Sequence, residues 1–311
     1  MGSIIGAHLA RAGHSVAMLA RGRRAQDIQE HGLRIKGLVE FSTPVQTLTD
    51  PAQLRGAQVL IVTTKALGTA AALEPLRRAD VGVAFSVQNG VMKNELLAAA
   101  FGRARVLGSL ANISGELLES GEVLFTRNVN VFVGDLPDGI NARTQDVART
   151  LDNAGVRSTA VANIQGQEWS KFAGWVGLVA LSLTTRVSTW KYLSDADAAL
   201  LLVRLVREVG VLANACGVEL TDDSLFPVAT LCRASEPEAV AIIQRFGDEF
   251  RRNSPLHRLS TLQDLEAGRA LEIEETLGFA VSKAAELKQA LPLLDATFRI
   301  ASAIDRTRKL G

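Results

Sequence analysis

The pattern of apolar and polar positions divides the chain into two parts of different character. In the first part, short apolar runs of strand length alternate with amphipathic segments of helical period. The clearest runs, Gln58–Thr64 and Val81–Val87, are almost continuously apolar and predict strands buried on both faces of a parallel sheet. Beyond about residue 165, nearly every segment has a helical period. We therefore predict an α/β domain over residues 1–165 and an all-α domain over residues 166–311.

The first residues already have a helical pattern. Ile4, Ile5 and His8 share one face, and Gly13 is placed to end the helix. A dinucleotide-binding domain begins instead with a strand and the glycine-rich turn G-x-G-x-x-G. We therefore expect a Rossmann-like domain whose first strand is missing from this chain, with Gly2 as the third glycine of the turn. Such a chain is expected to bind a dinucleotide weakly, because the first two glycines and several backbone N–H donors are absent.

The second part predicts a succession of helices with a ligand site in the cleft beside the α/β domain. The predicted helices are Glu168–Leu183, Ala196–Cys216, Pro237–Phe246, Thr261–Gln289 and Leu293–Thr307. Asp264 and Glu272 are eight residues apart, so on one helix they are expected to share a face. Ser260 and Gln263 have the spacing of a capping box, so capping of the helix that follows is one role open to Ser260, beside ligand binding.

Composition narrows the class of protein. The 311 residues are 47% hydrophobic and carry a net charge of +1, so no nucleic-acid partner and no membrane surface are expected. We expect a cytoplasmic protein, because no signal peptide is evident and the two cysteines, Cys216 and Cys232, lie in helical patterns without the spacing of a metal site. No metal is predicted, since the four histidines show no ligand spacing.

A basic cluster suggests which dinucleotide would bind. The residue that contacts the adenosine ribose lies ~20 residues after the glycine-rich turn, at the end of the second strand. Arg21 occupies that position, followed by Arg23 and Arg24. A guanidinium pairs with the 2′-phosphate of NADPH, whereas a carboxylate at this position would bind the 2′-hydroxyl of NADH. We therefore predict NADPH. The alternative is a solvated basic turn without a ligand.

Several segments together resemble one family, the 2-dehydropantoate 2-reductases or ketopantoate reductases. In chain order they are GSIIGAHLARAGHSVAMLARG, VTTKA, QNG, EWSKFAGW, REVGVLANACGV and LSTLQDLEAGRALEIEETLG. The resemblance covers nearly the whole chain. It implies a Rossmann-like domain followed by a helical domain, and the NADPH-dependent reduction of ketopantoate to pantoate in pantothenate biosynthesis.

The resemblance also implies roles on the cofactor side. Arg21 matches the arginine that takes the 2′-phosphate, and Lys65 matches a lysine close to the cofactor. Asn89 matches an asparagine at the junction of cofactor and substrate. Asn89-Gly90 is also a common turn, so the residue type alone does not establish a site. Asn89 nevertheless follows a predicted parallel strand, at the edge where such sheets bind ligands.

On the substrate side, Lys171 matches the catalytic lysine of the family. Ser260 matches a serine that holds the substrate carboxylate, Glu272 matches a glutamate that binds its hydroxyl end, and Asp264 occupies a position where the family also has an aspartate. An ammonium group beside the ketone oxygen stabilises the developing negative charge and donates a proton, which suits Lys171. The alternatives are a lysine on an ordinary amphipathic helix and, for Glu272, membership in a solvated acidic stripe.

The chain departs from the family pattern after the lysine. The family has asparagines four and eight residues later, where this sequence has Trp175 and Val179. Loss of amides that bind a substrate hydroxyl changes selectivity. We keep three alternatives to ketopantoate reduction. They are reduction of a more apolar 2-oxo acid, NADP(H) binding without turnover, and another hydride transfer, with a 3-hydroxy acid or an imine as the substrate. The apolar helices suit a homodimer interface or a monomer core equally.

Overall fold

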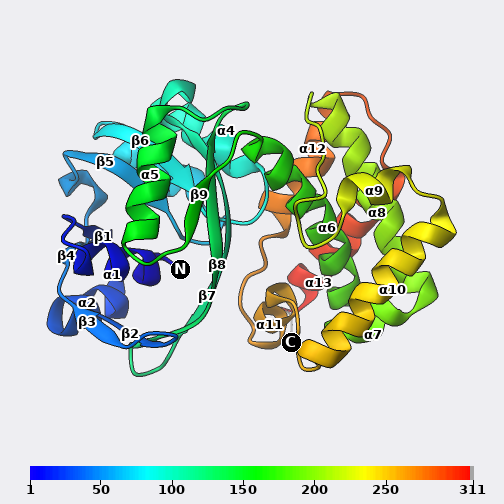
Figure 1. Cartoon of the computed structure of the whole chain (residues 1–311), viewed down its shortest axis with the longest axis horizontal. Helices are drawn as coiled ribbons and strands as arrows, with labels where there is room; N and C mark the ends of the chain where they lie inside the picture. The colour runs from blue at the N-terminus through cyan, green and yellow to red at the C-terminus, as the bar shows by residue number, and fades with distance from the viewer. Residues whose placement is uncertain (309–311) are drawn as a thin grey trace. The chain divides into compact units, whose positions relative to one another are not determined.

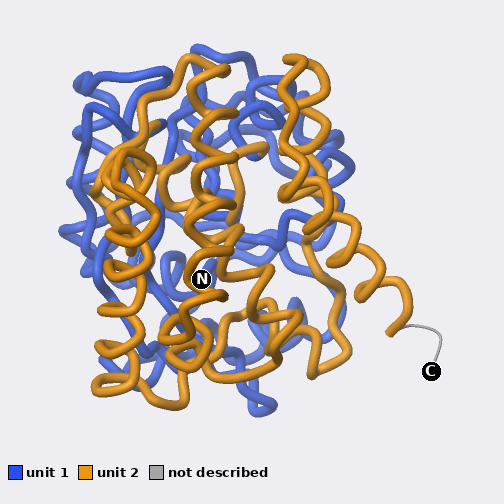
Figure 2. The backbone as a smooth tube through the Cα atoms, turned by 90° about the vertical axis from the view of Figure 1, so that its right-hand side faces the viewer, with its two compact units in different colours: residues 1–88, 93–165 blue, residues 89–92, 166–311 orange. Residues whose placement is uncertain are grey.

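The computed structural model describes residues 1–308 and divides the chain into two compact units. Unit 1 comprises residues 1–88 and 93–165, and unit 2 comprises residues 89–92 together with residues from 166 onward (Figure 2). The short segment 89–92 therefore belongs with the helical residues, although the chain on both sides of it belongs to unit 1.

Unit 1 alternates strands and helices, as the apolar pattern predicts (Figure 1). Its strands are β1 (Ala17–Leu19), β2 (Leu33–Gly37), β3 (Phe41–Thr43), β4 (Gln46–Leu48), β5 (Gly56–Val62), β6 (Asp80–Ser86), β7 (Leu107–Leu117), β8 (Val123–Asp135) and β9 (Ser158–Ala160). Its helices are α1 (Gly2–Arg11), α2 (Gly22–His31), α3 (Thr69–Leu73), α4 (Met92–Phe101) and α5 (Ala142–Asn153), with 3₁₀ turns at Pro51–Gln53, Glu74–Leu76 and Arg103–Arg105. The predicted glycine stop is confirmed: Gly13, with a φ of +90°, follows α1. Gly32, with a φ of +71°, ends α2 in the same way.

The strands of unit 1 form three hydrogen-bonded groups. β1 pairs in parallel with β4, and β5 pairs in parallel with β6. The third group has the order β3-β2-β8-β7, with β9 paired to β8; β2 and β9 run parallel to β8, whereas β3 and β7 are antiparallel to their neighbours. A single parallel bridge between Ala84 and Val106 joins the end of β6 to the segment that leads into β7. The predicted α/β class is confirmed.

One strand is less buried than predicted. We expected Gln58–Thr64 to be enclosed on both faces, but no residue of β5 is fully buried and Val59 is 38% exposed. The prediction was wrong because β5 has β6 as a neighbour on one side only among the described residues, so its other edge is not covered by a further strand. β6 matches the prediction better, since Val81 and Phe85 are fully enclosed.

Unit 2 is helical apart from its connecting loops, as predicted. Its elements are α6 (Ile164–Thr185), α7 (Thr189–Ser194), α8 (Ala196–Ala215), α9 (Val228–Arg233), α10 (Glu236–Asn253), α11 (Ser260–Glu266), a π-helix η4 (Glu274–Gly278), α12 (Phe279–Glu286) and α13 (Pro292–Thr307). One large apolar cluster, which includes Val176 on α6, Leu205 on α8 and Leu294 on α13, forms its core. Within residues 1–308, no helix is both long enough and apolar enough to cross a membrane.

The predicted single helix over Thr261–Gln289 is wrong. α11 ends at Glu266, and Gly268 follows with a φ of +65°, a left-handed conformation that ends helices. Residues 269–272 are not helical, and the chain then enters the π-helix and α12. The error arose because the apolar period continues through the break, whereas backbone conformation at a glycine interrupts the helix.

Candidate functional site

Arg21 lies just after the carboxyl end of β1, where it forms the N-cap of α2. Its backbone is extended, with φ −128° and ψ 157°, and its side chain is exposed. Within residues 1–308 its guanidinium makes no hydrogen bond or ion pair. Its donors are therefore available to an anionic ligand at the end of a parallel strand, where sheets of this class bind phosphates and riboses.

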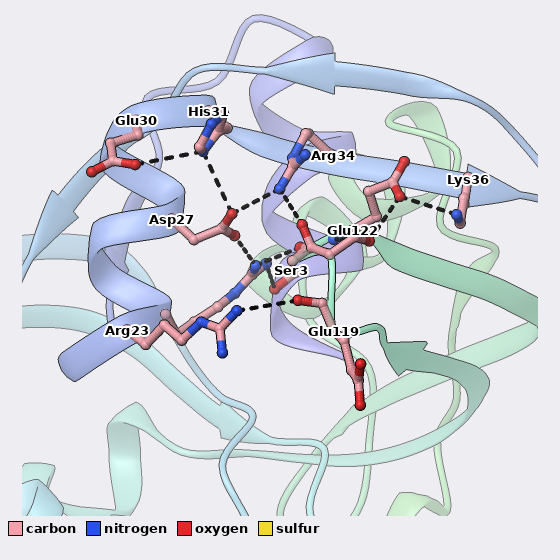
Figure 3. Close-up of polar contacts among 12 residues, drawn as sticks. Ser3, Arg23, Asp27, Glu30, His31, Arg34, Lys36, Glu119 and Glu122 are labelled. Carbon is pink, nitrogen blue, oxygen red and sulfur yellow. Dashed lines mark hydrogen bonds and ion pairs between the residues drawn. The ribbon is translucent and has the colours of Figure 1, made fainter.

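The other two arginines of the predicted basic cluster make internal contacts. Arg24 donates to Asp27 Oδ2 at 2.5 Å and to Ser3 Oγ at 3.0 Å, and burial lowers the pKa of its guanidinium although Asp27 opposes that shift. Arg23 donates to the carbonyl oxygen of Glu119 at 3.5 Å, as the close-up of this region shows (Figure 3). The three arginines thus differ in availability: Arg24 bonds to Ser3 and to the Gly121 carbonyl oxygen, whereas Arg21 is exposed and has no partner among residues 1–308.

Gly2, at the start of α1, lies very close to the end of β5. A Cβ atom built on Gly2 would be 2.3 Å from Thr63 Oγ1, a distance that real Cβ contacts do not reach. A larger residue would therefore displace Thr63 or push α1 away from β5. The absence of a side chain at Gly2 thus permits a close approach of helix and strand, a property that the third glycine of a dinucleotide-binding turn also provides.

Lys65 follows β5, and its backbone is fixed by a buried glutamine at the end of β6. Gln88 is 5% exposed, and its Nε2 donates to the Lys65 carbonyl oxygen at 2.9 Å and to Thr69 Oγ1 at 2.8 Å. Its Oε1 accepts a hydrogen bond from Ser86 Oγ at 2.9 Å. Gln88 thus joins the loops that follow two neighbouring parallel strands, while the Lys65 side chain remains exposed at that edge.

Sequence reasoning did not single out the buried cation beside this network. Lys93, in the first turn of α4, is 5% exposed, and its Nζ donates to the carbonyl oxygens of Gln88, at 3.2 Å, and of Ser109. Ser109 Oγ in turn donates to the Ser86 carbonyl oxygen at 2.7 Å. A lysine near the start of a predicted amphipathic helix normally lies in solvent, so no sequence signal distinguished Lys93.

Asn89 opens the four-residue segment that belongs to unit 2. Its neighbour Gly90 has a φ of +81°, so the predicted turn is present. A Cβ atom built on Gly90 would lie 3.1 Å from Thr276 Cγ2, and Val91 is buried in the core cluster of unit 2. The turn that carries Asn89 therefore packs directly on the π-helix at Glu274–Gly278.

Lys171 lies in the second turn of α6 and is half-buried. Aromatic side chains surround its position along the helix: Trp169 and Phe172 make an edge-to-face contact at 6.1 Å, and Phe172 stacks on Trp175 at 6.3 Å. Trp169 and Phe172 are buried in the core cluster of unit 2, whereas Lys171 keeps part of its surface exposed.

The two positions where the family pattern has asparagines differ from each other in their surroundings. Trp175 is partly buried and packs against the core cluster of unit 2, whereas Val179 is fully enclosed within that cluster. An amide at position 179 would need hydrogen-bond partners inside an apolar core. The apolar replacement of Val179 is thus part of the helical core, and Trp175 is the residue with surface left to contact a ligand.

Glu272 lies two residues before the π-helix and is half-buried. Thr276, one turn further on, donates its hydroxyl proton to the Glu272 carbonyl oxygen. The prediction that Asp264 and Glu272 share a helix face is wrong, because the break after Glu266 separates them. Asp264 instead forms an ion pair with Arg269 across that break, with Oδ1 2.6 Å from Nε.

Ser260 is the first residue of α11 and is exposed. The predicted capping box is wrong: Leu259 is the N-cap, no side chain caps the helix, and Gln263 donates to the Arg258 carbonyl oxygen instead. The capping box of this unit lies at α10, where Ser235 and Glu238 bond reciprocally. The Ser260 hydroxyl is therefore not occupied as a helix cap.

The candidate residues fall into two groups, one in each unit. Gly2, Arg21 and Lys65 follow strand ends or open a helix in unit 1; Asn89, Lys171, Ser260 and Glu272 belong to unit 2. Thr276 bonds to Glu272 and lies against Gly90, the neighbour of Asn89. This contact was not predicted, because nothing in the sequence indicates a π-turn there.

Two family models match the chain in succession. The model described as ketopantoate reductase PanE/ApbA matches residues 1–138, and the model of its C-terminal part matches residues 163–305. The chain belongs to the ketopantoate reductase PanE/ApbA family. The boundary between the two matches lies where the α/β unit gives way to the helical unit.

Curated relatives are distant in sequence but align over most of their own length and most of this chain. A 2-dehydropantoate 2-reductase of Archaeoglobus fulgidus is 28% identical over 295 residues, covering 92% of this chain and 88% of the relative. An uncharacterized oxidoreductase of Bacillus subtilis is 26% identical over 306 residues, covering 96% and 93%. The prediction of an oxidoreductase of this family, acting on a CH–OH group, is confirmed at the level of the family.

Solved structures share the fold of this ketopantoate reductase family member. A 2-dehydropantoate 2-reductase from Methylococcus capsulatus superposes with a TM-score of 0.81 at 24% identity, covering 99% of this chain and 94% of that one. A D-mandelate dehydrogenase solved with NADH and anilino(oxo)acetate gives a TM-score of 0.83 at 20% identity, covering 99% of this chain and 96% of that one.

Among residues 1–308, no cluster of three or more His, Cys, Asp or Glu side chains is arranged to hold a metal ion.

Proposed function

We propose that this chain reduces a 2-oxo acid to a 2-hydroxy acid with NADPH, and that 2-dehydropantoate is the first substrate to test. The observation that carries the proposal is the packing of the Asn89 turn on the π-helix next to Glu272, which groups two of the expected substrate residues within the unit that also bears Lys171. Membership of the ketopantoate reductase family supports the same reaction class.

Lys171 is the proposed proton donor. As the substrate carbonyl gains a hydride, negative charge develops on its oxygen, and a neighbouring ammonium both stabilises that charge and transfers a proton to it. The half-buried position of Lys171 favours this role, because partial exclusion of water strengthens the interaction between ammonium and oxyanion.

Ser260, Glu272 and Asn89 are the proposed substrate-binding residues. The exposed hydroxyl of Ser260 can donate a hydrogen bond to the substrate carboxylate. The Glu272 carboxylate can accept a hydrogen bond from a hydroxyl group at the other end of the substrate. Asn89 offers both an amide donor and an acceptor at the end of a parallel strand, next to the expected nicotinamide position.

The residues of unit 1 fit a dinucleotide with a 2′-phosphate. Gly2 allows α1 to approach β5 as closely as a pyrophosphate-binding turn requires, and Arg21 offers an exposed guanidinium with no partner among residues 1–308. Lys65 follows β5, which pairs in parallel with β6, and Gln88 donates a hydrogen bond to its carbonyl oxygen. A nicotinamide dinucleotide supplies the hydride when bound. We assign Gly2, Arg21, Lys65 and Asn89 to its binding.

A second candidate substrate is a 2-oxo acid with a more apolar tail. Trp175 keeps part of its surface free of the core, at a position where the family pattern has an amide. An indole there favours an apolar substituent over one with a hydroxyl group, since a buried hydroxyl without a partner costs binding free energy.

Steady-state turnover of the purified chain tests the proposal. NADPH oxidation would be measured with 2-dehydropantoate and with a series of 2-oxo acids that carry longer or aromatic tails, and each assay would be repeated with NADH. We expect turnover with NADPH and a preference within the series that identifies the substrate. NADPH binding by calorimetry, without turnover of any 2-oxo acid, would instead favour a cofactor-binding protein that lacks reductase activity.

A further inference from the structure

Thr276 makes two contacts that involve different candidate residues. Its hydroxyl donates to the Glu272 carbonyl oxygen, four residues earlier in the chain. Its Cγ2 methyl lies against Gly90, 3.1 Å from the position that a Gly90 Cβ atom would take. Thr276 is 1% exposed, so both contacts are shielded from solvent.

The π-helical conformation of residues 274–278 explains why the Glu272 carbonyl oxygen takes a side-chain donor, the Thr276 hydroxyl. Residues 274–278 form a π-helix, in which N–H groups pair with carbonyl groups five residues back and the regular α-helical pairing is displaced. A threonine hydroxyl can serve the carbonyl four residues back instead. The Thr276 hydroxyl therefore fixes the backbone of Glu272 at the point where the helix geometry changes.

The methyl group of Thr276 packs against Gly90, in the turn that carries Asn89. Gly90 holds a φ of +81° and presents no side chain, so the turn approaches the π-helix closely. Val91, next in sequence, is buried in the core of unit 2. The Asn89 turn is thus clamped between the core and the Thr276 methyl group.

We infer that Thr276 is a positioning residue that fixes the Asn89 turn and Glu272 relative to each other, through its methyl group on one side and its hydroxyl on the other. The kinetic part of this inference rests on the proposed function, since it takes Asn89 and Glu272 as substrate-binding residues. The structural part concerns only the two contacts.

Two conservative variants separate the two contacts. Thr276→Val keeps the methyl group against Gly90 and removes the hydroxyl, whereas Thr276→Ser keeps the hydroxyl and removes the methyl group. Thr184→Val is the matched control, because Thr184 Oγ1 donates to the Ala180 carbonyl oxygen at 2.7 Å, which is the same type of bond four residues back, in α6.

Hydrogen–deuterium exchange tests the structural part without any activity. We expect Thr276→Val to speed exchange of backbone amides in residues 272–276, and Thr276→Ser to speed exchange in residues 89–92, while Thr184→Val leaves both segments at the wild-type rate. Wild-type exchange in both segments, or the same change in both segments for both variants, would overturn the inference.

Kinetics test the functional part in the same proteins. We expect Thr276→Val to lower kcat/KM for the 2-oxo acid on the order of tenfold, since small misplacement of binding groups is costly, while the KM for NADPH changes by less than about twofold. A merely structural defect would move both constants together. If the wild-type chain turns over no 2-oxo acid, the proposed function fails, and the exchange experiment still decides whether Thr276 couples the two segments.

Discussion

The two units hold their candidate residues in place by different means. In unit 1, buried polar side chains do so: Gln88, just after β6, and Lys93, in the first turn of α4, donate to backbone carbonyl groups and order the loops after β5 and β6. In unit 2, Lys171 and Ser260 lie on separate helices, and Asn89 and Glu272 lie in non-helical segments next to the π-helix and the apolar core. In unit 1, a network of polar side chains therefore fixes the loops that carry candidate residues. In unit 2, the places where helices end determine which candidate side chains come together.

The largest expected effect is on the chemistry assigned to unit 2. We expect Lys171→Ala to lower kcat by roughly 10²–10⁴-fold, the usual contribution of a positioned general acid, while NADPH binding changes little. Steady-state kinetics and calorimetric titration with NADPH measure the two effects. Lys191→Ala is the control, since Lys191 is exposed on α7 beside Trp190 and should retain wild-type turnover. Undiminished turnover of Lys171→Ala would remove Lys171 from the mechanism.

The next effect tests the cofactor side of unit 1. We expect Arg21→Ala to raise the KM for NADPH by about 10–100-fold and to leave the KM for NADH unchanged, because only NADPH carries the phosphate that a guanidinium would bind. The comparison variant is Arg23→Ala, whose guanidinium has a 3.5 Å contact with the Glu119 carbonyl oxygen. Equal losses for both coenzymes in Arg21→Ala would contradict the assignment of the 2′-phosphate to this residue.

A smaller effect on stability tests the polar network itself. We expect Lys93→Met to lower the free energy of unfolding by ~1–3 kcal/mol, because two buried carbonyl oxygens lose a charged donor. Lys36→Met provides the contrast: Lys36 forms a partly exposed ion pair with Glu122 at 3.0 Å, and such pairs contribute ~0–1 kcal/mol. Urea denaturation of both variants measures the difference, and equal stabilities would show that burial of Lys93 has no energetic consequence.

The smallest effect concerns pH and the interior of unit 2. Burial raises the pKa of Tyr192 from 10.0 to about 12, although a hydrogen bond to Thr189 opposes the shift. Because the folded pKa lies above the unfolded one, this contribution to stability is fully present below pH 10 and is lost as pH rises towards 12. We expect Tyr192→Phe to weaken the alkaline decline in stability. Tyrosinate absorbance reports the titration directly, since the chain has a single tyrosine.

Side-chain types at strand ends were the part of the site most accessible from sequence. Arg21 and Asn89 each follow a strand, and a parallel strand presents its carboxyl end to ligands whatever the rest of the domain does. The helical part was less accessible. The pairing of Asp264 with Glu272 failed, because a continuous apolar period does not reveal that Gly268 turns the backbone away.

The sequence by itself determined the division into an α/β and a helical part, the family, and the residue types that can carry reduction of a ketone. These follow from local periodicity and from short motifs, which neighbouring residues in the chain define. Only the tertiary structure decided that Lys93 is buried, that Arg24 bonds to Ser3 and Gly121 while Arg21 is available, and that Thr276 contacts both Gly90 and Glu272. Each of these depends on residues distant in sequence or on a backbone irregularity, and neither leaves a periodic signal in the chain.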